Sequence, residues 1–344
     1  MYSLLISTFS GSTVLPTPLL PSRQKAARRL RSTQSSTEIA LYDDACCLGK
    51  NTENGLVVAH FGQQVLVEPP DRHRLFRCLL RPNDDPLAVG DRVLWCPGIT
   101  VESPGRIASL LPRSSLLTRP HRQAHAKPVA ANVDQLLVVM AALPEPSCRL
   151  IDQFLIAAQA CSLTAILILN KMDLLDAAQR NLLDVYEQLG YHCVFTQANQ
   201  SVLNALPLLL QHTSSILLGP SGVGKSSLIN ALIPDAAQQI RAVSERSGLG
   251  QHTTTTARLF HLNGEALLID APGIREFSLD LYSKNQIIEG YKEIAPLIGH
   301  CRFRNCQHLQ EPGCALKEAL ANGQIHPSRF KNFMEFSAHA TPLF

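Results

Sequence analysis

Hydrophobic and polar positions alternate over short stretches in the part of the chain that follows residue 50. Five strand-like runs occupy residues 56–59, 65–67, 75–80, 92–96 and 106–110. Turn-forming residues separate these runs, including Pro69, Pro70, Gly90 and Gly98. Short strands divided by turns in this way predict a small β-barrel, for which the OB-fold is the leading candidate.

The pattern changes near residue 135 to buried apolar runs that alternate with amphipathic ones. Strands are predicted at 135–142, 164–169, 193–196 and 214–218, and helices at 149–161, 174–189 and 226–232. Residues 258–262 and 265–270 are predicted to form paired strands, and the chain beyond residue 279 is predicted to be helical. This alternation is typical of a doubly wound α/β sheet whose strands are mainly parallel. The basic, proline-containing stretch 113–128 is predicted to be a linker.

The pattern therefore predicts a multidomain chain. We expect a flexible basic arm at 1–50, an OB-fold barrel at 51–118, an α/β domain at 119–280 and a mainly helical domain at 281–344. The chain of 344 residues is long enough for each folded part to bury its own core. A hydrophobic content of 45% and a charged content of 17% exclude a disordered chain.

Composition also bears on the compartment. No apolar run approaches the roughly 18 residues of a membrane span. The apolar patches of residues 1–20 precede the positive charges and are interrupted by Ser, Thr and Pro, which disfavours a secretory signal. The 10 cysteines are accordingly expected to be cytosolic thiols and not a disulfide framework.

Charge is unevenly distributed, although the net charge is only +3. No acidic residue precedes Glu38, whereas basic residues cluster at Arg23, Lys25, Arg28, Arg29 and Arg31. Contact with RNA phosphates is one interpretation of this arm; a solvated tail and an organellar transit peptide are the others. The barrel has a similar pair of interpretations, RNA binding or a role as a docking module only.

A complete phosphate-binding loop follows the strand at 214–218. It fits G-x-x-x-x-G-K-[ST], in which backbone amides cradle phosphates, Lys225 reaches the β- and γ-phosphates and the Ser226 hydroxyl meets Mg²⁺. The N-terminus of the following helix adds positive potential. The predicted nucleotide contacts are Gly219, Pro220, Ser221, Gly222, Val223, Gly224, Lys225, Ser226 and Ser227.

A guanine-reading motif, N-K-x-D, is predicted directly after the strand at 164–169, at Asn170, Lys171, Met172 and Asp173. The Asp173 carboxylate would accept from the N1–H and the exocyclic amine of guanine. The alternative is that Asp173 is only the N-cap of the next helix. This motif precedes the phosphate loop, whereas in an ordinary GTPase it follows it. The reversed order predicts a circularly permuted GTPase.

An acidic residue ends the predicted strand at 265–270. Asp270 is expected in the Mg²⁺ shell, and the Gly273 N–H is expected near the γ-phosphate. The alternative is an ordinary D-x-P-G turn.

The Gly- and Thr-rich stretch 248–256 occupies the place of a first switch. The threonine of such a switch supplies a hydroxyl to Mg²⁺. The alternative is an ordinary loop that enters a strand.

Ile274 stands where many GTPases have a glutamine that orients water. Because isoleucine cannot do so, we expect hydrolysis to be slow unaided or to use another group. His252, within 248–256, is the predicted catalytic substitute; packing or partner binding are its alternative roles.

Three cysteines and one histidine are grouped near the C-terminus. Together they form a Cys₃His set suited to a closed, tetrahedral, structural zinc site, with unligated cysteines as the alternative. Four protein ligands would leave no position for a catalytic water. The predicted ligands are Cys301, Cys306, His308 and Cys314. Basic residues flank them, which makes this region a second candidate for RNA contact; they are Arg302, Arg304, Lys317, Arg329 and Lys331.

In order and content, these motifs resemble the RsgA/YjeQ family of bacterial ribosome small-subunit-dependent GTPases. The resemblance runs from about residue 55 to residue 333. It also includes V-G-D-R-V at 89–93, T-R-P at 118–120, A-N-V-D-Q at 131–135 and D-A-P-G-I-R-E-F at 270–277.

The resemblance implies an OB-fold, a permuted GTPase domain and a zinc domain. It implies a late step of 30S maturation in which the subunit stimulates GTP hydrolysis, with 16S rRNA, GTP, Mg²⁺ and one zinc ion as partners of a cytoplasmic monomer. By position, it implies that Thr254 is the switch threonine in the Mg²⁺ shell and that His252 is catalytic. No base-side loop is assigned at 195–198.

Two rival functions stay open on the sequence. The chain could be a translation GTPase that acts on a protein or tRNA partner. It could also be a zinc-stabilised RNA-binding module in which GTP is only a sensed ligand.

Overall fold

The computed structural model describes most of the chain between residues 52 and 340. The described residues are 52–81, 84–98, 103–119, 127–196, 206–233, 236, 257–263, 265–271, 279 and 282–340. The chain divides into a unit of residues 1–51, which includes the predicted basic arm and lies outside the described residues, and a unit of residues 52–344.

Five strands close into a barrel, which confirms the prediction of an OB-fold. They are β1 (Glu53–His60), β2 (Gln64–Glu68), β3 (Phe76–Leu79), β4 (Arg92–Cys96) and β5 (Gly105–Leu110). They lie in the order β1-β2-β3-β5-β4, and a further β4–β1 pairing closes the ring. The β3–β5 pair is parallel and the others are antiparallel. Alternate side chains, among them Val57, Val65, Val93 and Trp95, fill the interior.

The predicted linker at 113–128 is wrong in part, because strands lie at both of its ends. β6 (Leu116–Arg119) and β7 (Lys127–Ala131) form an antiparallel pair. Leu117 and Ala130 are buried in the same core as the neighbouring α/β sheet. Basic residues and prolines conceal these strands in the sequence, since burial of a few apolar side chains is enough to stabilise so short a pair.

The described residues of the α/β part form six sheet strands in the order β10-β9-β8-β11-β13-β12. These are β8 (Gln135–Ala141), β9 (Thr164–Asn170), β10 (His192–Phe195), β11 (Ser214–Leu218), β12 (Arg258–His261) and β13 (Leu267–Asp270). All pair in parallel except β12 with β13. The strand that feeds the phosphate loop, β11, is central, and the strand that ends at the guanine motif, β9, precedes it in the chain. This order confirms the circular permutation.

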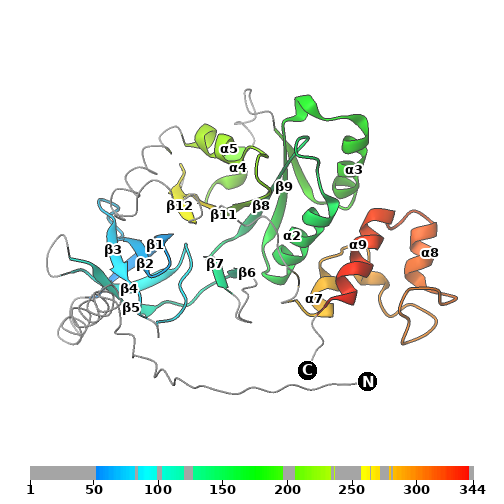
Figure 1. Cartoon of the computed structure of the whole chain (residues 1–344), viewed down its shortest axis with the longest axis horizontal. Helices are drawn as coiled ribbons and strands as arrows, with labels where there is room; N and C mark the ends of the chain where they lie inside the picture. The colour runs from blue at the N-terminus through cyan, green and yellow to red at the C-terminus, as the bar shows by residue number, and fades with distance from the viewer. Residues whose placement is uncertain are drawn as a thin grey trace, which may run out of the picture. The chain divides into compact units, whose positions relative to one another are not determined.

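Helices cover both faces of this sheet, as a doubly wound fold requires. Leu136, Val138 and Met140 of β8 pack on one face with α2 (Cys148–Ala160), and Tyr186 of α3 (Ala177–Gln188) lies in the same core. Leu137 and Val139 face the opposite way, toward α4 (Leu206–Leu210) and α5 (Lys225–Leu232). Figure 1 shows α2 against β8 and β9, with α4 and α5 on the other side.

The helix predicted at 174–189 begins three residues later than expected. Its N-cap is Asp176, which forms a reciprocal capping box with Gln179. Residues Met172–Leu174 instead form a short 3₁₀ turn, η1. Asp173 is therefore not a helix N-cap, and that alternative for the N-K-x-D motif is excluded.

The C-terminal segment is helical, as predicted. It contains α7 (Lys284–Glu289), a 3₁₀ turn η3 (Ala295–Leu297), α8 (Ala315–Ala321) and α9 (Pro327–Ala338). α7 and α9 pack against α2 and against each other. Within the described part of the chain, no helix is both long and apolar enough to cross a membrane.

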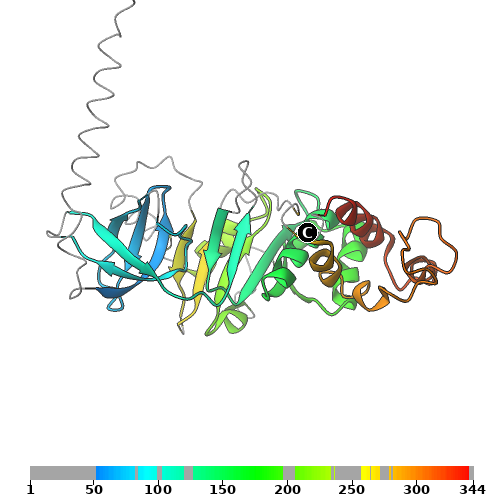
Figure 2. The ribbon, with the colours of Figure 1, turned by 90° about the horizontal axis from the view of Figure 1, so that it is seen from below.

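One strand joins the barrel to the α/β sheet. β12 pairs with β13 and, through Arg258 opposite Ala59, with β1 of the barrel. His261 Nε2 and Glu68 Oε2 are 2.6 Å apart across the same junction. Figure 2 shows β12, in yellow, between the blue barrel strands and the green strands of the sheet.

Candidate nucleotide site and metal centre

Three predicted motifs meet at one edge of the α/β sheet. In the parallel register Ala141 is opposite Asn170, Val138 is opposite Leu218, and Leu217 is opposite Asp270. The strands β9, β11 and β13, with β8 between β9 and β11, therefore end at the same edge of the sheet, where open α/β sheets bind their ligands. The guanine motif, the phosphate loop and Asp270 come from distant parts of the sequence and lie together for this reason.

The phosphate loop has the tight conformation that its glycines permit. Gly219 has a φ of +148°, and a Cβ there would lie 2.2 Å from the Val139 carbonyl oxygen. The Lys225 ammonium donates to the carbonyl oxygens of Gly219 and Pro220, both at 2.7 Å. Lys225 is also the first residue of α5, so the loop leads directly into the N-terminus of that helix. The arrangement suits an anionic phosphate chain.

The guanine motif is bonded directly to the phosphate loop. The buried Asn170 amide donates from Nδ2 to the Val223 carbonyl oxygen at 2.9 Å. Lys171 donates from Nζ to the Gly222 carbonyl oxygen at 2.7 Å. A Cβ on Gly224, whose φ is +99°, would lie 2.3 Å from Asn170 Nδ2. The close approach of the two motifs thus depends on a glycine, and Asp173 is exposed beside them.

Thr196 supports this motif and was missed in the sequence. Its hydroxyl donates to Asn170 Oδ1 at 3.0 Å, and its backbone oxygen accepts from the Met172 N–H at 3.3 Å. The side chain is 1% exposed. The signal available was a hydroxyl residue at the end of the strand predicted at 193–196, within the stretch 195–198 to which no base-side loop is assigned.

We expect Thr196→Val to weaken GDP binding by about tenfold, because it leaves the buried Asn170 carbonyl oxygen without its donor at a cost of about 1–3 kcal/mol. Titration with fluorescently labelled GDP would measure the change in affinity. Thr196→Ser, which keeps the hydroxyl, is the matched control and should bind nearly as the wild type does. Equal affinity in all three proteins would show that Thr196 does not position Asn170.

Asp270 has the character of a cation ligand. Its Oδ1 is buried and has no hydrogen-bond partner among the residues that the structure describes. Burial raises the pKa of the Asp270 carboxyl, and the cations of Lys225 and Arg258 act in the opposite direction. An unsatisfied buried carboxylate oxygen is costly unless a cation or donor meets it. A carboxylate oxygen is a ligand that Mg²⁺ prefers, and Ser226, the other predicted ligand among the described residues, lies in the first turn of α5.

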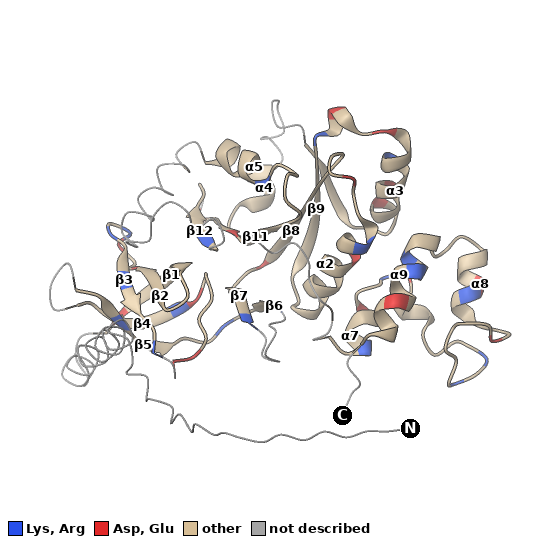
Figure 3. Ribbon diagram, viewed as in Figure 1, with Lys and Arg blue, Asp and Glu red and all other residues tan. Residues whose placement is uncertain are grey.

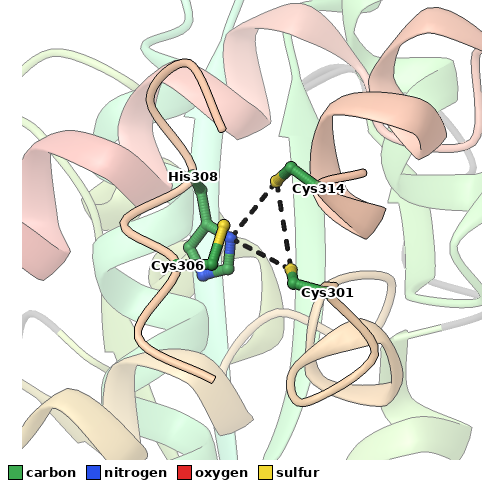
Figure 4. A group of neighbouring side chains, drawn as sticks. All are labelled: Cys301, Cys306, His308 and Cys314. Atoms are coloured by element: carbon green, nitrogen blue, oxygen red, sulfur yellow. Dashed lines mark hydrogen bonds between the residues drawn. The ribbon is translucent and has the colours of Figure 1, made fainter. Parts of the chain in front are cut away.

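The four predicted metal ligands converge, as Figure 4 shows. The ligand atoms of Cys301, Cys306, His308 and Cys314 all lie within 4.8 Å of one another. The Cys301 and Cys314 sulfurs are 4.0 Å apart, and His308 Nδ1 lies 3.5 and 3.4 Å from them. A tetrahedral zinc ion with Zn–S bonds of about 2.3 Å would set its sulfur ligands about 3.8 Å apart. The group can therefore hold a metal ion through three sulfurs and Nδ1.

The loop that carries His308 is organised by a residue not singled out from the sequence. Glu311 accepts from the backbone N–H groups of Gln307, Leu309 and Gln310 at 2.8, 2.9 and 3.0 Å. These bonds lower the pKa of the Glu311 carboxyl to about 2. His308 itself has a φ of +62°. The carboxylate thus holds a tight loop around a strained ligand residue.

The basic residues around this cluster differ in exposure. Arg302, Arg304 and Lys331 are exposed and Lys317 is half-buried, and Figure 3 shows basic positions in the loop before α8 and on α9. Arg329, in contrast, is 1% exposed and is paired with carboxylates. Its prediction as an RNA contact is wrong, because a side chain buried in ion pairs cannot reach a phosphate.

The remaining predicted site residues lie outside the described residues. These are the proposed catalytic residue, the switch threonine, the γ-phosphate-facing glycine and the residue in the place of the water-orienting glutamine: His252, Thr254, Gly273 and Ile274.

Comparisons with known proteins agree with this geometry. The family model for the RsgA GTPase matches residues 110–280. The chain is 44% identical over 315 residues to the small ribosomal subunit biogenesis GTPase RsgA of Hahella chejuensis, which covers 89% of this chain and 90% of that protein. It is 46% identical over 294 residues to the protein of that name from Azotobacter vinelandii, with coverage of 83% and 85%.

Solved structures agree as well. YjeQ from Thermotoga maritima matches with a TM-score of 0.63 and 33% identity, over 83% of this chain and 98% of that one. YloQ, described as a circularly permuted GTPase, matches with a TM-score of 0.60 and 24% identity, over 85% and 96% of the two chains. The second match bears on the fold alone.

Proposed function

Since the chain belongs to the RsgA GTPase family, we propose that it binds the small ribosomal subunit, acts late in that subunit's maturation and is stimulated by it. It is a GTP-hydrolysing enzyme of ribosome biogenesis. The direct bonding of the N-K-x-D motif to the phosphate loop, at the ends of permuted parallel strands, supports the GTPase activity. The observation that carries the small-subunit part is the similarity to proteins named small ribosomal subunit biogenesis GTPase RsgA. A site with both motifs in contact can select guanine and hold phosphates at once.

Each group in the nucleotide site has a proposed task. Backbone N–H groups of residues 219–227, apart from Pro220, surround the phosphates, and Lys225 leaves its loop carbonyl oxygens to neutralise the β- and γ-phosphates. The exposed Asp173 carboxylate accepts from guanine, with its place fixed by Asn170 and Thr196. The chemistry is mainly positioning and charge stabilisation, since phosphoryl transfer needs little covalent help from the protein.

A magnesium ion bound with GTP would offset the negative charge of the phosphates. Ser226, Thr254 and Asp270 are its proposed ligands, directly or through water. The Gly273 N–H is proposed to face the γ-phosphate. His252 is proposed to replace the missing glutamine in handling the attacking water.

The Cys₃His group is proposed to hold one structural zinc ion, because three thiolates and one imidazole are the ligands that zinc prefers in closed sites. The division of the chain at residues 50, 118 and 280 is kept as a proposal. In this division the zinc segment is a separate C-terminal domain.

The proposed partner is the 16S rRNA of the 30S subunit. Exposed Arg302, Arg304 and Lys331 beside the metal group are suited to phosphate contacts. We also propose that the protein is a monomer. It is proposed to act in the cytoplasm, because small subunits are assembled there.

Co-sedimentation with purified small subunits tests the partner. We expect the chain to pellet with small subunits and not with large subunits, and to pellet less as the salt concentration rises. The amount that pellets should differ between a non-hydrolysable GTP analogue and GDP. Equal pelleting with large subunits, or with tRNA, would favour a translation GTPase of another kind. Equal pelleting with the GTP analogue and with GDP would favour an RNA-binding module.

A further inference from the structure

A cluster of buried polar groups outside the nucleotide site joins the C-terminal helices to α2 and α3. Its centre is Asp152, in α2, whose side chain is 0% exposed. The carboxylate accepts from Arg329 Nη1 at 2.5 Å and from Asn332 Nδ2 at 2.7 Å, both on α9. It also accepts from the hydroxyls of Tyr186 on α3 at 2.9 Å and of Tyr291 at 3.3 Å. Four donors from three separate segments therefore meet on one carboxylate.

Arg329 is fixed by a second carboxylate. Its Nε and Nη2 donate to the two oxygens of Glu293 at 2.7 and 2.9 Å, a bidentate arrangement that permits one orientation. The guanidinium carbon lies 4.4 Å from the ring centroid of Tyr291. Burial of ionised groups is costly, and apolar residues would pack here at least as well for stability. What the charges add is a defined geometry.

The position of the cluster relates it to the guanine motif. α2 leads into β9, which ends at Asn170, and α3 begins at Ala177, just after Asp173. The two helices that flank the guanine motif in the chain thus carry Asp152 and Tyr186. Glu293 and Arg329 belong to the segment that bears the Cys₃His group. The cluster bonds that segment to the helices on either side of the guanine motif.

We propose that this cluster, defined as Asp152, Glu293 and Arg329 with their hydrogen-bond donors, is a positioning device for subunit-stimulated turnover. It holds the metal-bearing segment in one orientation on α2 and α3, so that a contact made by the segment changes the nucleotide site. If the segment were loosely held, a contact would move the segment alone and would not change the nucleotide site. The inference rests on the proposed function, because it assigns a route for the subunit's effect.

Glu293→Gln and Arg329→Met test the route. GTP turnover is measured with and without saturating small subunits, and GDP affinity is measured alone. We expect turnover without subunits and GDP affinity to stay within about twofold of wild type, and subunit stimulation to fall by about tenfold. The matched control is Glu335→Gln, which removes an exposed ion pair between Glu335 of α9 and Arg149 of α2. It should leave stimulation unchanged.

The outcomes separate the possible roles. Variants that unfold at lower temperature but keep full stimulation while folded would overturn the inference and leave the cluster purely structural. Glu293→Gln keeps the Arg329–Asp152 pair and so supplies a folded protein if Arg329→Met does not fold.

Absence of stimulation in the wild type would overturn the proposed function instead. The attachment is then judged by amide hydrogen exchange in α9. Faster exchange in Glu293→Gln than in the wild type supports the attachment, and equal exchange overturns it.

Discussion

Replacement of Lys225 with alanine is expected to lower GTP turnover by a factor on the order of 10² to 10³, with a smaller effect on the fold. The ammonium donates to two carbonyl oxygens of its own loop, Gly219 and Pro220, and its charge lies at the N-terminus of α5. Transfer of the γ-phosphoryl group concentrates negative charge where that ammonium would act. Single-turnover hydrolysis of radiolabelled GTP would measure the loss.

A matched control is Lys292→Ala, which removes a lysine stacked on Tyr191 far along the chain from the phosphate loop. It should hydrolyse GTP at the wild-type rate. If Lys225→Ala lost turnover and still pelleted with RNA, the GTPase account would stand. Unchanged activity in ribosome assembly would mean that hydrolysis is dispensable, as expected of a module that only senses GTP.

Removal of the metal from the Cys₃His group is the second large effect. Cys314 is buried and is the N-cap residue of α8, and Arg302 N donates to the Gly313 carbonyl oxygen beside it. Without a metal ion, three thiols and an imidazole face one another and the tight loop loses its centre. We expect Cys314→Ser to lose bound zinc and to destabilise this segment by about 4 kcal/mol or more, since structural metal sites supply much of their segment's folding energy.

Metal content by elemental analysis and thermal unfolding would measure both effects. Cys193→Ser, in β10, is the matched control and should retain one zinc ion per chain. A wild-type protein that carries no zinc after purification with zinc present, or a Cys314→Ser variant with unchanged unfolding, would contradict a structural metal centre.

Much of the fold could be predicted because hydrophobic periodicity reports burial directly. The apolar strand ending at Asn170 and the one leading to Gly219 are buried on both faces, so their patterns stand out. The order of the motifs then predicted the permutation. The hairpin of β6 and β7 could not be predicted in this way, because only a few of its residues are buried among prolines and basic side chains.

The site shows the same limit. A motif such as the phosphate loop is contiguous, whereas the Thr196 hydroxyl reaches Asn170 from another strand end, and only the fold brings the two together. Arg329 is the clearest example. As a basic residue beside a metal cluster it resembles a nucleic-acid contact, but its charge is matched by Asp152 and Glu293, which are remote in sequence. Charge in a sequence does not reveal its partner.

The proposed activation by the small subunit is a change in the rate of GTP hydrolysis. Steady-state GTP hydrolysis is measured with and without purified small subunits, at several salt concentrations and with large subunits as the control. We expect slow turnover alone, a rise of at least about tenfold with small subunits only, and loss of that rise as salt weakens phosphate contacts. Equal turnover with and without small subunits, in protein shown to bind GTP, would contradict it.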